Sequence, residues 1–310
     1  MGAGHDHGHA HGALGASAGS RHSARLKTVV ATSTLILLLQ IVGGVLSHSL
    51  ALLADAGHTA TDVFGVTMAL VAIRYAARPA NPERTFGYYR LEILAAAANA
   101  MLLFAVAVWV TYKAVLRFSE PVEVASGTML TIAAIGMAVN LGGLLLLRGG
   151  KDESLNIRGA YMEVLADMLG SVAVLIAALL IRTTGWHGWD PVASIVIGAM
   201  ILPRTWLLLR EAVNVLLEGT PRGMDLSAVR DHLRGTDGVT DVHDLHAWTI
   251  TSGLPVLSAH IVVEPRVLNG EQTGAILNTL RECLHGHFDV EHSTFQLEPV
   301  GYRESDGICV

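Results

Sequence analysis

Six apolar runs, each long enough to cross a lipid bilayer, limit the folds open to this 310-residue chain more than any other feature. A helix needs about 20 apolar residues to cross a hydrocarbon core roughly 30 Å thick. Inside that core every backbone polar group must be hydrogen-bonded within the protein, which helices achieve on their own. We therefore predict six membrane-spanning helices, at residues 28–46, 50–72, 91–116, 127–147, 159–181 and 192–217.

The composition agrees with a protein solvated mostly by lipid. Charged residues make up 15% of the chain, against about 25% in a typical soluble domain, and 51% of the residues are hydrophobic. These values exclude a purely cytosolic enzyme and a disordered regulator. The formal net charge of −6 argues against nucleic acid as a partner, because a nucleic-acid binder needs a basic excess. Two cysteines, Cys283 and Cys309, are too few for a secreted disulfide framework.

The connections between the runs differ in positive charge, and this difference predicts the orientation. No small-residue cleavage site follows the first run, so we interpret it as a retained helix and not as a signal peptide. Positive charge gathers in the second and fourth connections, at Arg74, Arg78, Arg84, Arg90, Arg148, Lys151 and Arg158. The positive-inside rule then places both termini in the cytoplasm of a multi-pass protein, with the cell membrane as the expected location.

The composition changes after the sixth run. We divide the chain into a His-rich cytoplasmic tail at 1–26, a six-helix membrane domain at 27–217 and a cytoplasmic domain at 218–310. The last region carries 14 acidic and 6 basic side chains. Its pattern predicts helices near 225–234 and 271–284, with strands near 239–250, 256–263 and 294–297. This order favours a small α+β domain with helices on an open sheet.

Ionisable side chains inside two of the runs are the main functional signal. The second run contains Asp55, His58 and Asp62, and the fifth contains Glu163 and Asp167. Within each run these residues are three, four or seven positions apart, so they share one helix face. At about 1.5 Å per residue, the two pairs also reach similar depths in the membrane. Two facing pairs would offer four ligands, which suits a tetrahedral divalent cation.

The alternative is that these polar groups only join helices through hydrogen bonds. We interpret the amides of Gln40, Asn99 and Asn140 in this way. Matched acidic pairs at the same depth in two runs are harder to explain as helix contacts, because charged groups in a membrane are costly and are usually functional.

Several motifs, in the same order along nearly the whole chain, resemble the zinc-transporting branch of the cation diffusion facilitators. They are residues 49–62 (SLALLADAGHTATD), 86–92 (FGYYRLE), 190–191 (DP), 217–221 (LEGTP) and 242–248 (VHDLHAW). The resemblance implies a homodimer of six-span protomers, each with a ferredoxin-like cytoplasmic domain. It also implies export of a divalent metal from the cytosol in exchange for protons. The family's transport site matches His58, Asp62, Glu163 and Asp167 of this sequence.

One position departs from the family pattern, because zinc members usually have histidine where this chain has Glu163. Three carboxylates and one imidazole still suit zinc, but the lost nitrogen weakens the preference over manganese or iron(II). Zinc remains the expected substrate, with manganese or iron(II) as the alternative. We hypothesise that Asp55, one turn further out, relays protons or accepts a hydrogen bond from His58. The metal is the substrate here, and we expect no prosthetic group.

Histidines outside the spans form two further groups. By resemblance, His246, His260, His292 and Glu298 match positions where the family binds a regulatory metal in the cytoplasmic domain. In the N-terminal tail the alternating residues His5, His7, His9 and His11 predict weak metal capture. Ordinary surface histidines are the alternative in both cases.

Two other classes of function are alternatives to a transporter. An intramembrane metalloenzyme would need a catalytic base beside its metal, and the HExxH zinc-protease motif is absent from the sequence. A membrane metal sensor could use the histidines of the tail domain, but it would not need ionisable pairs at matching depth. The sequence therefore predicts a metal–proton antiporter and not an enzyme.

Overall fold

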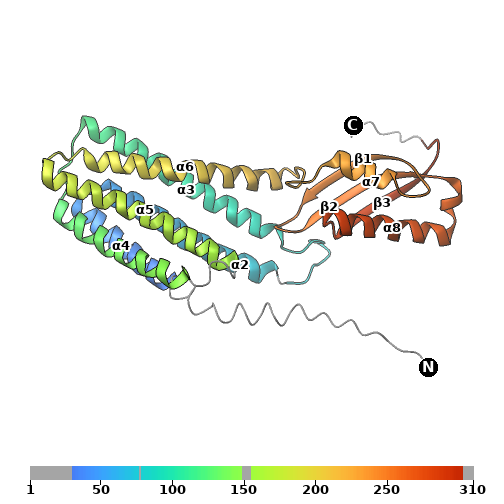
Figure 1. Cartoon of the computed structure of the whole chain (residues 1–310), viewed down its shortest axis with the longest axis horizontal. Helices are drawn as coiled ribbons and strands as arrows, with labels where there is room; N and C mark the ends of the chain where they lie inside the picture. Colours follow the sequence, from blue (N-terminus) through green and yellow to red (C-terminus); the bar gives the residue numbers. More distant parts are fainter. Residues whose placement is uncertain (1–29, 77, 149–154, 303–310) are drawn as a thin grey trace, which may run out of the picture. The chain divides into compact units, whose positions relative to one another are not determined.

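The computed structural model describes residues 30–76, 78–148 and 155–302. Within this part of the chain, six helices are long and apolar enough to cross a membrane, which confirms the six predicted spans. The first covers Val30–Ser47. The others are α2 (Leu50–Ala76), α3 (Arg90–Ser119), α4 (Ser126–Arg148), α5 (Leu155–Thr184) and α6 (Trp189–Leu216) (Figure 1).

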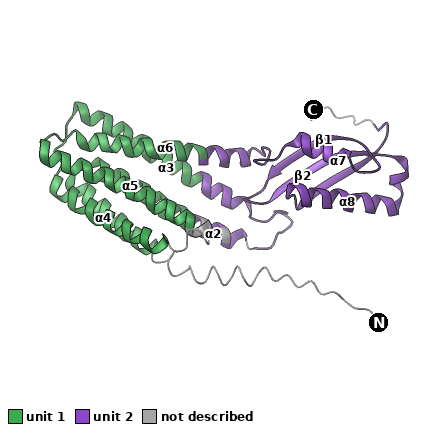
Figure 2. Cartoon of the chain, viewed as in Figure 1, with its two compact units in different colours: residues 1–67, 98–207 green, residues 68–97, 208–310 purple. Residues whose placement is uncertain are grey.

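The chain forms two compact units, which Figure 2 shows in different colours. The first unit comprises residues 1–67 and 98–207, and the second comprises residues 68–97 and 208–310. The second unit therefore has two parts. One is the link between α2 and α3 together with the adjoining ends of these helices, and the other is the C-terminal part of the chain.

The first unit is a helical bundle with small residues inside and large apolar residues outside. Its core contains alanines from five helices, namely Ala51, Ala54, Ala107, Ala114, Ala133, Ala177, Ala178 and Ala193. Large side chains such as Leu35, Met101, Leu145 and Ile176 are more than half exposed. Small residues allow helices to approach closely, while the outward apolar surface is stable only in lipid. Within this bundle α4 and α5 lie side by side.

The N-terminal end of α2 is fixed by a buried carboxylate at the start of α6. Asp190 accepts hydrogen bonds from the Ser49 hydroxyl at 2.6 Å and from the backbone N–H of Leu50 at 2.8 Å. It also pairs with the Arg117 guanidinium of α3 at 2.8 Å. A helix N-terminus carries unsatisfied N–H groups and a partial positive charge, so a carboxylate stabilises it. This contact sets the position of α2 relative to α3 and α6.

The C-terminal part of the second unit has the predicted helix–strand–strand–helix–strand order. Its elements are α7 (Leu226–Arg234), β1 (Val239–Thr249), β2 (Pro255–Val263), a 3-10 helix (Pro265–Leu268), α8 (Gly270–Phe288) and β3 (His292–Pro299). The strands form one sheet in the order β1-β2-β3, with β1 antiparallel and β3 parallel to β2. The α+β prediction is confirmed, and β3 is longer than the 294–297 that the sequence indicated.

The two faces of this sheet differ in chemistry. Leu257, Ile261 and Val263 of β2 are fully buried in one core with Val229 of α7 and Leu280 of α8. Because successive side chains of a strand point to opposite faces, the even-numbered residues of β2 lie on the face away from this core. His260 is one of them. The hydrophobic face thus holds the helices, and the other face carries a histidine.

Candidate metal centres

Three ionisable side chains from α2 and α5 converge inside the bundle. His58 and Asp62 come from α2 and Asp167 from α5, and each offers one ligand atom within 4.8 Å of the others. The His58 Nε2 atom lies 3.6 Å from Asp62 Oδ2 and 3.8 Å from Asp167 Oδ1. His58 is 8% and Asp167 is 6% exposed. The spacing that suggested facing pairs therefore brings three of the four expected ligands together.

The donor set of this cluster fits a small divalent cation. Asp62 Oδ2 and Asp167 Oδ1 are buried and have no hydrogen-bond partner among the described residues. Tetrahedral coordination at about 2.0–2.2 Å would place neighbouring ligand atoms roughly 3.4 Å apart, close to the distances from His58 Nε2. One imidazole nitrogen and two carboxylate oxygens are also a ligand set that zinc accepts. A cation would thus satisfy polar atoms that otherwise lie buried and unpaired.

Glu163, the fourth expected ligand, contacts both this cluster and an arginine of α6. Its side chain shares a hydrogen bond with Asp62, and its Oε2 atom pairs with a guanidinium nitrogen of Arg204 at 3.2 Å. Arg204 lies in α6 directly after Pro203. Arg204 was not among the residues expected at this site, although an arginine inside an apolar run is itself a functional signal.

Asp55 is buried and has two hydrogen-bond donors from other helices. The Gln40 amide nitrogen donates to Asp55 Oδ2 at 2.6 Å, and the Ser171 hydroxyl donates to the same oxygen at 3.3 Å. Gly170 lies against the other carboxylate oxygen, so closely that a Cβ atom there would lie 2.4 Å from Asp55 Oδ1. Asp55 therefore links the first helix, α2 and α5, one turn away from His58.

A second cluster lies on the sheet face away from α7 and α8. His243, His260 and Glu298 each offer a ligand atom within 4.8 Å of the others. Glu298 Oε2 lies 3.0 Å from His243 Nε2, and Glu298 Oε1 lies 3.0 Å from His260 Nδ1. The strand register explains the grouping, since His243 is opposite His260 on β1 and β2, and His260 is opposite Gln296, two positions before Glu298. Two imidazoles and a carboxylate are suitable zinc ligands.

The structure places the other expected cytoplasmic residues outside this group. His246 contacts Asp244 at 2.8 Å, and the His292 ring packs edge-on against Phe86. The strand pairing shifts between His243 and His246, where Asp244 has a positive φ of 46°. Strict alternation along β1 fails at such a bulge, so a periodic pattern does not reveal that His243 faces His260. The resemblance had indicated His246 and not His243.

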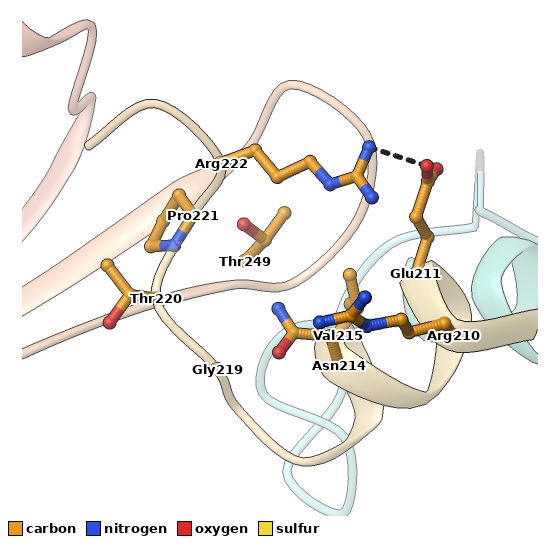
Figure 3. A pocket seen from close by; sticks show the side chains of 9 residues that line it. All are labelled: Arg210, Glu211, Asn214, Val215, Gly219, Thr220, Pro221, Arg222 and Thr249. Atoms are coloured by element: carbon orange, nitrogen blue, oxygen red, sulfur yellow. Dashed lines mark ion pairs between the residues drawn. The ribbon is translucent and has the colours of Figure 1, made fainter. Parts of the chain in front are cut away.

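The remaining predicted ligands, His5, His7, His9 and His11, lie outside the described residues. A pocket of about 410 Å³ also lies within the second unit (Figure 3). Its lining residues are Arg210, Glu211, Asn214, Val215, Gly219, Thr220, Pro221, Arg222 and Thr249. The one carboxylate among them, Glu211, pairs with Arg222 at 2.5 Å, so this pocket does not offer a cation site.

Comparisons with known proteins identify the same family in both parts of the chain. Residues 26–217 match the family model of the cation efflux transmembrane domain, and residues 221–300 match that of the cation efflux protein cytoplasmic domain. The metal cation efflux system protein CzcD of Cupriavidus metallidurans is 44% identical over 99% of this chain and 93% of its own length.

Two further relatives and one solved structure extend the comparison. The cadmium, cobalt and zinc/H(+)-K(+) antiporter of Bacillus subtilis is 41% identical over 88% of both chains. The zinc transporter ZitB of Escherichia coli is 39% identical over 84% of this chain and 83% of its own. The solved metal-bound C-terminal domain of the Cupriavidus CzcD transporter is 36% identical, with a TM-score of 0.22, and the match covers 24% of this chain and 99% of that one.

Proposed function

This chain belongs to the cation efflux family of metal transporters, and from this premise we propose that it exports zinc from the cytosol in exchange for protons. It is a multi-pass membrane protein, with the plasma membrane as its proposed location and both termini in the cytoplasm. Its relatives are transporters of divalent metals.

The convergence of His58, Asp62 and Asp167 carries this proposal. The three side chains come from two membrane-spanning helices, are largely buried and turn ligand atoms toward one another. A purely structural cluster would pair its carboxylate oxygens with donors, as Asp55 does with Gln40 and Ser171. In contrast, Asp62 Oδ2 and Asp167 Oδ1 lack such partners among the described residues. A cation that occupies the site temporarily accounts for this difference.

Exchange with protons follows from the chemistry of these ligands. A dication in the membrane needs ionised carboxylates, and the same carboxylates without the metal bind protons. The metal and the protons therefore compete for Asp62 and Asp167. If the bundle opens alternately to each side, cytosolic zinc displaces protons on one side and incoming protons displace zinc on the other. Asp55, one turn from His58, remains our proposed intermediate station for the proton.

The cytoplasmic cluster supports a regulatory role for metal. We propose that His243, His260 and Glu298 bind cytosolic zinc, with His246 joined to the cluster through Asp244, whose other carboxylate oxygen lies 3.5 Å from His260 Nε2. The matched cytoplasmic domain model belongs to a family of dimerisation domains, which supports a homodimer as the working form.

The alternative functions have less support. The three relatives described above are named for zinc, cadmium, cobalt or metal cations in general, which favours zinc over manganese or iron(II). A metal sensor would explain the cytoplasmic cluster, but it would leave the intramembrane cluster without a purpose. An enzyme is disfavoured because the family consists of transporters.

Metal flux into proteoliposomes under an imposed pH gradient tests the proposal. Zinc, cadmium, manganese and iron(II) are compared for the wild type, for Asp62→Ala combined with Asp167→Ala, and for a control pair, Glu123→Gln combined with Glu282→Gln. Both control carboxylates are exposed and lie outside the two clusters. We expect gradient-dependent zinc flux in the wild type and the control, and none in the Asp62/Asp167 variant.

Two results would overturn parts of this proposal. Zinc flux that does not respond to the pH gradient would remove the proton coupling. Absence of flux for every cation, together with tight zinc binding to the purified protein, would favour the metal sensor.

A further inference from the structure

The pocket at the end of α6 has a positive charge that no acidic group in its lining balances. Its one carboxylate, Glu211, is already paired with Arg222 at 2.5 Å (Figure 3). Arg210 also lines the pocket and is exposed, and it has no ion pair among the residues that the structure describes. The neighbouring Glu218 pairs with Arg90 at 2.7 Å and does not neutralise it. Two arginines and one glutamate leave the lining with a net charge of +1.

The uncharged polar groups of the pocket can donate hydrogen bonds to an anion. Asn214 offers an amide N–H₂ group, and Thr220 and Thr249 each offer a hydroxyl group. These side chains come from α6, from the connection that follows it and from the end of β1. Phosphate oxygens accept hydrogen bonds from arginine, amide and hydroxyl donors, so this lining fits a phosphate group.

Backbone hydrogen bonds close the end of α6 beside the pocket. Free carbonyl groups at a helix C-terminus carry a partial negative charge, which would oppose an anion. Here the carbonyl oxygens of Val213, Asn214 and Val215 accept hydrogen bonds from the backbone N–H groups of residues 217–219. Glu218 has a positive φ of 57°, which lets the chain turn back onto these carbonyls. The end of the helix therefore does not cancel the charge of the arginine.

The pocket lies at the depth of the lipid headgroups. A hydrocarbon core about 30 Å thick takes about 20 helical residues, at about 1.5 Å each. The helix α6 begins at Trp189, a residue type that favours the membrane interface, so about 20 residues further on the core ends close to Arg210. Leu208 and Val213, on either side of Arg210 in the sequence, are 47% and 41% exposed. Apolar surface that suits an acyl chain thus adjoins the arginine.

From these observations we propose that the pocket binds the phosphodiester headgroup of an anionic phospholipid such as phosphatidylglycerol. The net charge of +1 matches the single negative charge of such a headgroup, and basic pockets at the cytoplasmic ends of membrane helices suit anionic lipids. A volume of about 410 Å³ falls within the range of about 300–1,000 Å³ that is typical of small-molecule sites. The site is separate from both metal clusters, so it goes beyond the proposed transport function.

Lipid binding to the purified full-length protein tests the proposal without any metal or transport step. Native mass spectrometry counts the bound lipids and gives apparent dissociation constants. The probes are phosphatidylglycerol, zwitterionic phosphatidylcholine with the same acyl chains, and free glycerol 3-phosphate. The variant is Arg210→Gln. The matched control is Arg148→Gln, which removes an exposed arginine from the last turn of α4, outside the pocket.

We expect the wild type to bind phosphatidylglycerol at least about fivefold more tightly than phosphatidylcholine, the effect of one basic side chain on an anionic lipid. Arg210→Gln should abolish this preference, and Arg148→Gln should retain it. Equal affinity of the wild type for the two lipids, or a preference that survives Arg210→Gln, would overturn the proposal. Glycerol 3-phosphate that binds as tightly as phosphatidylglycerol would identify a soluble phosphate as the ligand and exclude the lipid.

A second variant covers the case in which Arg210→Gln does not fold. Glu211→Gln removes the carboxylate that pairs with Arg222, so the net charge of the lining rises from +1 to +2. Binding of phosphatidylglycerol should then tighten by about fivefold, and binding of phosphatidylcholine should stay unchanged. If phosphatidylglycerol binds this variant no more tightly than the wild type, the pocket is not its site and the proposal fails.

Discussion

At the scale of single residues, the two metal clusters differ in how far their carboxylates are already satisfied. Glu298 is 3% exposed and contacts His243, His260 and the Gln296 amide, all at 3.0 Å or less. The intramembrane cluster leaves Asp62 Oδ2 and Asp167 Oδ1 without such partners among the described residues. In the proposed regulatory role, a metal entering the cytoplasmic cluster displaces existing contacts of Glu298, which favours release once cytosolic zinc falls.

The first prediction concerns which histidines bind this cytoplasmic metal. His243→Ala should weaken zinc binding by at least about tenfold, the usual scale for a lost contact at a metal site. His292→Ala should leave binding unchanged, because its ring packs against Phe86 and away from the cluster. Isothermal titration of the full chain measures both, with Asp62→Asn and Asp167→Asn added to disable the intramembrane site. An equal loss in the two variants would contradict the assignment.

The second prediction concerns Gly170, the position against which Asp55 packs. Gly170→Ala places a methyl group 2.4 Å from Asp55 Oδ1, so either α5 or Asp55 must move. We expect a loss of about 1–3 kcal/mol in the free energy of unfolding, as for an overpacked core. Gly159→Ala on the same helix meets no atom within 4 Å and serves as the control. Unfolding in mixed micelles measures both variants, and equal stability would show that Asp55 is loosely held.

At the scale of secondary-structure elements, the proposed transport site depends on how α2 is anchored. His58 and Asp62 lie two and three turns from the N-terminus of this helix, where Asp190 accepts hydrogen bonds from Ser49 and Leu50 and pairs with Arg117. Asp190 is fully buried. Because its partners come from the start of α2 and from α3, this carboxylate fixes the position of the α2 ligands relative to α3 and α6.

The third prediction is the cost of removing this anchor. Asp190→Ala should destabilise the protein by about 3–5 kcal/mol, because it leaves the Arg117 charge without its partner and the α2 terminus uncapped. The combined Asp190→Ala, Arg117→Ala variant should cost less than the sum of the two single changes. Unfolding in mixed micelles gives all three values. Strict additivity would mean that the two side chains do not interact appreciably.

Much of this architecture could be predicted from local sequence patterns, and the exceptions have physical causes. The length of the apolar runs predicted the six spans, and the four-residue spacing of ionisable residues predicted that His58 and Asp167 converge, because both features depend only on the geometry of single helices. The Glu163–Arg204 pair could not be predicted in this way, because Glu163 has a flexible side chain and local spacing does not show which group of another helix it contacts. The place of His243 depends on a bulge at Asp244, which periodicity along β1 does not reveal.

At the scale of the whole molecule, the second compact unit constrains the topology. It contains residues 68–97, which link α2 to α3, together with residues 208–310. Contacts within the unit join these parts, since Arg90 pairs with Glu218 at 2.7 Å and the Thr251 hydroxyl donates to Glu92 at 2.5 Å. Segments of one compact unit outside the bilayer lie on one side of it. The second connection is rich in arginine, so the positive-inside rule assigns that side to the cytoplasm.

The fourth prediction tests this topology with the two native cysteines, both of which follow the last span. A membrane-impermeant maleimide should label the protein in inside-out vesicles and not in intact cells. Glu120→Cys, in the third connection, is the control for the opposite side and should show the reverse preference once the native cysteines are replaced by serine. Labelling of the native cysteines in intact cells would invert the proposed orientation.

The pH dependence of labelling adds an internal check on the C-terminal fold. Burial raises the pKa of the Cys283 thiol, which lies on α8. Maleimide reacts with the thiolate, so Cys283 in a Cys309→Ser variant should react slowly near neutral pH. Below its pKa the thiolate fraction rises about tenfold per pH unit, and the rate in inside-out vesicles should rise with it. A rate near pH 7 equal to that of an unfolded control would mean that α8 does not cover this thiol in the membrane-bound protein.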